Sequence, residues 1–172
     1  MALIVEDGTG LSTAESYVSV ATATAYFTAF GGSDAWSSLE DQEVALRKAS
    51  RDLDILYGAS YASTPLTTAQ ALLFPRVTFT DSNGRTVTGL PKVLGQAVAE
   101  LAVINATTDT TGVADQSGNV KMKLLRADTV VKHTENFAPT SATSAVLRKV
   151  ALLLAPYLDG GSSGLYARVV RG

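Results

Sequence analysis

Apolar residues recur at helical spacing in four stretches of the chain. The most regular stretch ends at Tyr57, and its residues Leu46, Ala49, Leu53 and Leu56 follow the three-and-four spacing of a buried helix face. Comparable patterns predict helices over 19–30, 91–107 and 143–158. The hydrophobic pattern therefore predicts a mainly α fold, an α-helical bundle of about four helices.

Residues that favour helix ends mark most of these boundaries. Ser37-Ser38-Leu39-Glu40 has the form of a capping box ahead of the second helix, and Gly58 is its expected C-terminal cap. Ser19 can cap the first helix, which Gly31-Gly32 would end. Pro91 suits the first position of the third helix.

A second capping pattern, Thr67-Thr68-Ala69-Gln70, precedes a short apolar run. It predicts a brief helix over Ala71 to Phe74, which Pro75 would end because the residue before proline avoids helical geometry.

Three segments have the character of β-strands. Residues 2–6 predict a short strand that ends at the turn residues Asp7 to Gly10. Asn83-Gly84 lies between the alternating segments 77–79 and 85–87, which is a strong hairpin signal. Residues 120–131 alternate or are β-branched, so we expect a strand pair there as well. The fold class is thus mainly α with a β-hairpin or strand pair.

The chain divides into a body and a C-terminal extension. We expect one helical domain over residues 1–158, followed over 159–172 by a Gly- and Ser-rich linker and an extended arm. The arm alternates apolar and charged positions, so it could add as a strand to a partner's sheet edge; the alternative is a frayed terminus. Its candidate partner-binding residues are Leu165, Tyr166, Arg168, Val169, Val170 and Arg171.

The last predicted helix carries two apolar stripes and should be buried nearly all round. Either the chain's own core or a neighbouring subunit could cover the second stripe. The stripes are Val146, Val150, Leu153 and Tyr157, and Leu147, Ala151, Leu154 and Leu158.

Composition narrows the class of protein. The chain has 172 residues, of which 46% are hydrophobic and 17% charged, as expected for one globular domain. It has no cysteine, which excludes disulfides and thiolate metal sites. The longest apolar run, from Val150 to Pro156, is far shorter than the roughly 20 residues that cross a bilayer. We therefore expect no membrane partner.

Charge is distributed unevenly along the chain. The net charge is −2, but residues 1–120 hold 6 Lys/Arg against 13 Asp/Glu and residues 121–172 hold 8 against 3. Such a subunit could place an acidic face against a neighbour's basic face and close a ring; the alternative is unremarkable surface charge. The predicted strand pair carries a basic cluster, which could contact nucleic acid or another subunit: Lys121, Lys123, Arg126 and Lys132.

No arrangement of catalytic, metal-ligating or cofactor-binding residues can be named. His133 is the only histidine, and no nucleophile elbow accompanies it. Asp52 and Asp54 face about 200° apart on a helix, so we expect ordinary surface charges. The aromatic cluster of Tyr26, Phe27 and Phe30 is expected in the core rather than as a stacking platform. We therefore expect no enzyme, metal or cofactor.

Several segments, in order along nearly the whole chain, resemble a tailed-phage family often labelled "DnaT-like ssDNA-binding". They are the opening eleven residues with Ser16-Tyr17-Val18-Ser19, then 45–54, Ala71-Leu-Leu-Phe-Pro-Arg76, Leu90-Pro91 and the closing 168–172. The family often has tryptophan before its Pro-Arg step, where this chain has Phe74.

This resemblance implies a head-to-tail connector, or adaptor, in the virion neck, made in the host cytoplasm. Such a subunit would form a ring of about twelve copies beneath the portal protein, bind the next neck or tail-completion protein, and surround DNA without gripping it. The family label implies the alternative, a single-stranded nucleic-acid-binding protein. The acidic balance of the chain favours the connector, because nonspecific phosphate binding requires a basic surface.

Overall fold

The computed structural model describes residues 2–107 and 142–159, and their fold is mainly helical, as predicted. The α-helices are α1 (Val20–Phe30), α2 (Ser33–Ser37), α3 (Gln42–Tyr57), α4 (Lys92–Thr107) and α5 (Ala142–Leu154). Short 3-10 turns follow α3 and α5 at Gly58–Ser60 and Ala155–Tyr157. The strands β1 (Arg76–Thr80) and β2 (Thr86–Gly89) form an antiparallel hairpin.

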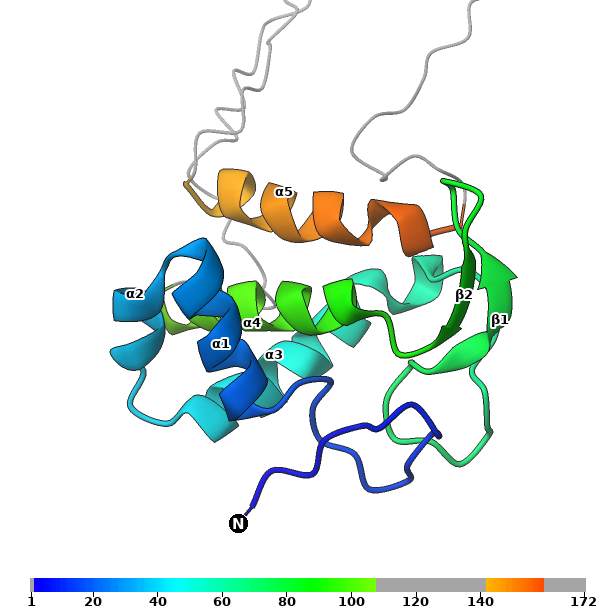
Figure 1. The fold of residues 1–172 in the computed structure, drawn as a ribbon, viewed down its shortest axis with the longest axis horizontal. Helices are drawn as coiled ribbons and strands as arrows, with labels where there is room; N and C mark the ends of the chain where they lie inside the picture. Colours follow the sequence, from blue (N-terminus) through cyan, green and yellow to red (C-terminus); the bar gives the residue numbers. More distant parts are fainter. Residues whose placement is uncertain (1, 108–141, 160–172) are drawn as a thin grey trace, which may run out of the picture.

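Helix α4 lies in the middle of the molecule. In Figure 1, α5 runs above it and α3 passes below and behind it, while α1 and α2 stand at one end and the hairpin at the other. The apolar side chains of these helices meet in one core. The largest fully buried side chains include Trp36, Leu46, Leu53, Phe74, Leu94, Leu101 and Leu154.

The predicted core faces of α3 and of α4 are confirmed with one exception; the predicted stripe of α4 is Leu94, Ala97, Val98, Leu101 and Ala102. Leu46, Ala49 and Leu53 of α3 are fully buried, as is the whole predicted stripe of α4, but Leu56 is 38% exposed. From Leu147 onward, the residues of both stripes of the last helix are buried or partly buried within this chain, which supports the internal-core alternative. Leu152, on the helix face opposite both stripes, is 64% exposed, so the prediction that this helix is buried nearly all round is wrong for that face.

The start of α3 differs from the prediction. Asp41, rather than a serine of the predicted capping box, is the N-cap, and its carboxylate accepts a hydrogen bond from the Val44 amide at 3.0 Å. Ser37 instead ends the additional short helix α2. The negative charge of Asp41 also interacts favourably with the positive end of the helix dipole.

The predicted helix over 71–74 is absent, because side chains outside it satisfy its backbone. The Gln70 amide donates to the carbonyls of Leu72 and Pro75, and the Leu73 amide donates to Asp54. The segment is an irregular turn, and the Phe74–Pro75 peptide bond is cis. Local hydrogen bonds from side chains thus replace the helical pattern.

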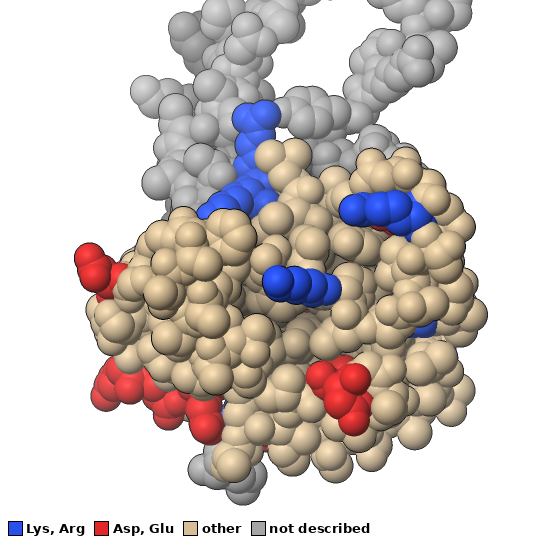
Figure 2. Space-filling view, in the orientation of Figure 1, with Lys and Arg blue, Asp and Glu red and all other residues tan. Residues whose placement is uncertain are grey.

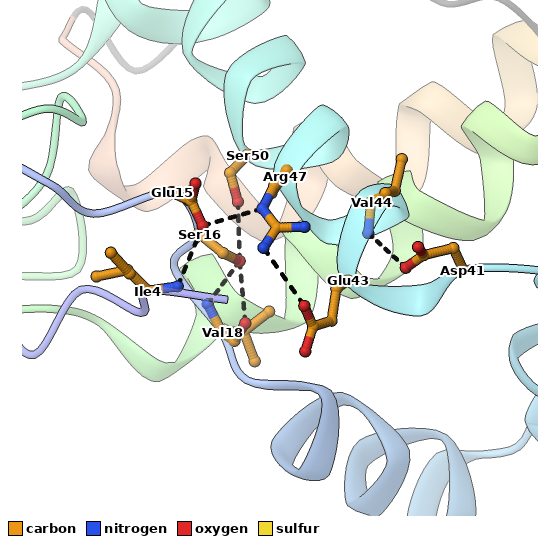
Figure 3. A network of polar contacts seen from close by, with 9 residues as sticks. All are labelled: Ile4, Glu15, Ser16, Val18, Asp41, Glu43, Val44, Arg47 and Ser50. Atoms are coloured by element: carbon orange, nitrogen blue, oxygen red, sulfur yellow. Dashed lines mark hydrogen bonds and ion pairs between the residues drawn. The ribbon is translucent and has the colours of Figure 1, made fainter. Parts of the chain in front are cut away.

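The predicted strand over 2–6 is reduced to a single parallel bridge between Val5 and Ser16. The buried Glu6 carboxylate instead gathers the following turn, accepting hydrogen bonds from the amides of Gly8, Gly10 and Leu11. Figure 3 shows how the same segment is tied to α3: Glu15 accepts from the Ile4 amide and from Arg47.

The hairpin at Asn83-Gly84 is confirmed, with Phe79 opposite Val87 and Thr80 opposite Thr86. Asp81 holds the turn, since its carboxylate accepts from the amides of Asn83 and Arg85. The predicted strand pair at 120–131 and the arm at 165–172 lie outside the described residues. Within the described ranges, no helix is long and apolar enough to cross a membrane.

A buried polar network joins α3 to the turn before β1. The Tyr17 hydroxyl lies 2.7 and 2.8 Å from the two carboxylate oxygens of Asp54, and accepts a hydrogen bond from the Phe74 amide. Burial raises the pKa of Asp54 to about 6, against the opposing hydrogen bonds from Leu73 and Tyr17. Asp52 is also buried and binds Asn105. The prediction that Asp52 and Asp54 are surface charges is wrong, because neighbouring elements cover both.

Arg76 fills the other side of this turn. Its guanidinium donates to the carbonyls of Ala62, Leu73, Tyr61 and Ser63, and lies 5.7 Å from the Tyr61 ring centroid and 5.8 Å from that of Phe74. A planar fork with five donors can serve this many carbonyls at once.

We predict that Arg76→Lys lowers the free energy of unfolding by about 1.5–3 kcal/mol, because an ammonium cannot reproduce the fork and leaves buried carbonyls without a donor. Urea unfolding of both proteins measures this. Equal midpoints and slopes would contradict the assigned role of Arg76.

We also predict that Asp54 makes stability depend on pH. Its pKa is raised in the folded state, so the folded protein holds the proton more tightly than the unfolded chain. The stabilisation is complete below about pH 4 and is lost as the pH rises through about 6, amounting to roughly 3 kcal/mol. Asp54→Asn should remove this component in urea unfolding at several pH values. Parallel pH profiles of the two proteins would rule it out.

Candidate functional site

The clearest candidate site among the described residues is a groove between α1 and α4. Its volume is about 210 Å³, and its walls are almost entirely apolar. Val18, Ala25 and Ala29 supply much of the surface, and Gly95 leaves room on the α4 side. A Cβ atom on Gly95 would lie 3.3 Å from the Val18 Cβ, so glycine allows the chain entering α1 to lie close against α4.

Two aromatic rings border the groove on the α1 side. Tyr26 and Phe30 lie one helical turn apart, with ring centroids separated by 5.1 Å and planes inclined by 35°. Phe27, between them, turns inward and stacks on Trp36 in the core. Phe30 is 73% exposed, so its ring is available to a ligand.

The Tyr26 ring is held in place by its hydroxyl group, which donates a hydrogen bond of 2.7 Å to Glu100 on α4. The same Glu100 oxygen accepts from Lys149 on α5. Burial, and secondarily the contact with Glu100, raises the pKa of Tyr26, so the hydroxyl stays protonated and remains a donor. Three helices thus fix one wall of the groove.

Polar groups border the opposite side. Lys92, at the first position of α4, is exposed and forms no ion pair with another described residue. Gln96, which also lines the groove, follows one turn later. On the face drawn in Figure 2, Lys and Arg residues lie over the middle and upper part, whereas Asp and Glu residues lie at the left edge and in the lower part.

This arrangement combines three chemical abilities. Exposed aromatic faces can stack on a flat ring, an ammonium can pair with an anion, and an amide can both donate and accept hydrogen bonds. A cavity of about 210 Å³ is smaller than the roughly 300–1,000 Å³ of sites for drug-sized molecules. The groove therefore suits one planar group rather than a large cofactor.

The site residues predicted from the sequence all lie outside the part of the chain that the structure describes. The basic cluster at Lys121, Lys123, Arg126 and Lys132 lies outside the described residues, as does His133. So do the arm residues Leu165, Tyr166, Arg168, Val169, Val170 and Arg171. None of them can be placed beside the groove or away from it.

The groove residues themselves were missed or misjudged from the sequence. The aromatic cluster was expected in the core, which is right for Phe27 and wrong for Phe30. Helical spacing puts Phe30 on the same face as the buried Ala23 and Phe27, and gives no sign that the last turn of α1 is uncovered. The sequence does offer one signal for the site: Lys92 follows Pro91 directly, which places a cation at the start of a predicted helix.

Other chemistry finds little support in the described residues. They contain no group of three or more His, Cys, Asp or Glu side chains that could hold a metal ion. Tyr17 and Asp54 bind each other and accept hydrogen bonds from the turn before β1, so their polar groups have a structural role.

Comparison with known proteins gives one match. A family model described as "Putative DnaT-like ssDNA binding protein" matches residues 1–172, the whole chain. No curated protein and no solved structure matches.

Proposed function

The chain belongs to the family described as "Putative DnaT-like ssDNA binding protein", and we propose on this premise that it binds single-stranded nucleic acid through the groove between α1 and α4. The observation that carries the proposal is the exposed Phe30 ring beside Tyr26 on one side of an apolar groove, with Lys92, which forms no ion pair within residues 2–107 and 142–159, on the other side. An unstacked base would lie against the aromatic rings, and Lys92 would pair with a neighbouring phosphate.

The energetics suit a weak, sequence-tolerant binder. Stacking of one base on an aromatic side chain contributes about 1–3 kcal/mol, and every base offers a flat face. The described residues hold 8 Lys/Arg against 12 Asp/Glu, so they provide little long-range electrostatic attraction for a nucleic-acid strand. Binding must therefore depend on contacts in the groove and on whatever the basic residues of 108–141 add.

We predict that Phe30→Ala weakens binding of a fluorescein-labelled oligothymidylate of about ten nucleotides at least fivefold, because one stacking face is lost. Lys92→Ala should weaken binding and reduce the slope of log affinity against log salt by about 0.7, the value for one phosphate contact on a single strand. Fluorescence anisotropy over a salt series measures both effects.

Matched controls come from α3, outside the groove. Ile55→Ala removes an exposed apolar side chain and Lys48→Ala an exposed cation, and neither residue lines the groove. Both controls should bind like the parent protein. No binding at micromolar protein and low salt, or equal losses in variants and controls, would refute the groove.

We propose a second candidate function, the ring-forming connector subunit of a tailed-phage neck. The polarised surface favours it: Glu40, Asp41 and Glu43 gather at the start of α3, whereas Arg148 and Lys149 lie beside the exposed Leu152 on α5. Acidic and basic faces of this kind can join copies head to tail, and such contacts close into a ring when the rotation allows.

This second candidate predicts that the protein co-sediments with the phage's portal ring as a complex of about twelve copies. Leu152→Glu should reduce the bound amount strongly, because it places a carboxylate in an apolar contact. Sedimentation velocity with and without portal measures this. A portal that sediments alone would contradict the connector role, and single-stranded DNA binding without portal binding would favour the first candidate.

A further inference from the structure

A second exposed surface lies on α3 and shares no residue with the groove between α1 and α4. Asp41, Val44, Lys48, Arg51 and Ile55 follow one another at spacings of three and four residues, and so form one stripe along the helix. We call this set the α3 stripe. It lies opposite the buried residues Leu46, Ala49 and Leu53. All of its members except Asp41 line an open hollow of about 440 Å³, together with Arg47 and Asp52.

The α3 stripe exposes two large apolar side chains. Val44 is 53% exposed and Ile55 is 60% exposed, one toward each end of the stripe. Between them lie Lys48, whose ammonium is 3.5 Å from Asp52, and Arg51, which pairs with no acidic group among the described residues. The stripe thus combines an acid, two cations and two exposed apolar side chains on one helix face.

We propose that the α3 stripe binds the same stripe of a second copy of this chain, with the two helices antiparallel. The stripe is self-complementary in charge, since it has one carboxylate at its N-terminal end and two cations further along. A two-fold axis between the helices places Asp41 of each copy opposite Arg51 of the other, which forms two ion pairs.

The same register accommodates the apolar residues. With Asp41 facing Arg51, Val44 of one copy lies beside Lys48 of the other, whose aliphatic stem can cover it. Ile55 then lies beside the segment that precedes α3 in the other copy, near the half-buried Leu39. Both exposed apolar side chains are thereby removed from water.

Two other occupants fit the α3 stripe less well. A nucleic-acid strand would gain nothing from Val44 and Ile55 and would be repelled by Asp41 and by Asp52, which also borders the hollow. An acidic protein partner would complement the cations but leave Asp41 opposed by like charge. A second copy satisfies both signs.

The test uses two charge reversals, alone and mixed. Arg51→Asp gives a stripe with acids at both positions, and Asp41→Lys gives one with cations at both, so each variant should lose self-association at least tenfold. Mixed in equal amounts, the two variants should restore a heterodimer, since every pair is then opposite in sign. Sedimentation velocity from about 10 μM to 1 mM measures this; one helix pair predicts a weak dimer.

Controls separate association from folding. Asp41 is the N-cap of α3, so Asp41→Asn, which keeps a capping side chain without the charge, should weaken the dimer while preserving the melting temperature. Asp34→Lys makes the same charge change on α2 and should leave self-association unaltered. A parent protein that is monomeric up to 1 mM, a dimer indifferent to the reversals, or a mixture that fails to associate would each overturn the proposal.

Discussion

The burial of α4 between α3, α5 and the chain that enters α1 is the constraint on which the rest of the structure depends (Figure 1). Leu94, Leu101 and the small residues between them are removed from water by α3, α5 and the chain that enters α1. Gly95 makes the last of these contacts possible, because any side chain there would press on Val18. The position of α1 against α4 in turn sets where Tyr26 and Phe30 lie relative to Lys92.

The helices could be predicted from sequence because their apolar spacing and end signals agree. The failures occur where side-chain hydrogen bonds decide the local structure. Gln70 and Asp54 hold 71–74 out of a helix, and Glu6 folds the first residues into a turn rather than a strand. The bonds from Gln70 and Glu6 reach backbone groups within five residues and compete with the helix or strand that the apolar pattern predicts. Asp54 reaches the Leu73 amide from another helix, so no local pattern encodes that contact.

At the candidate site, too, the sequence predicts which residues share a helix face but not which of them the neighbouring helices cover. Helical spacing identified the aromatic cluster on α1, but whether a ring is buried depends on where the neighbouring helices end. Phe27 meets Trp36 and is buried, whereas Phe30, three residues later, has no such neighbour and remains exposed. Lys92 enters the site because α4 begins beside α1, which is a property of the packing and not of the sequence around it.

The central claim is that single-stranded nucleic acid binds where α1 meets the start of α4. The most direct measurement is an NMR titration of the isotopically labelled protein with a short oligothymidylate, following every backbone amide. Binding in the groove predicts that the largest shifts fall on the last turn of α1 and the first turns of α4, around Tyr26, Phe30, Lys92 and Gln96. Shifts confined to other residues, or no shifts at millimolar oligonucleotide, would contradict it.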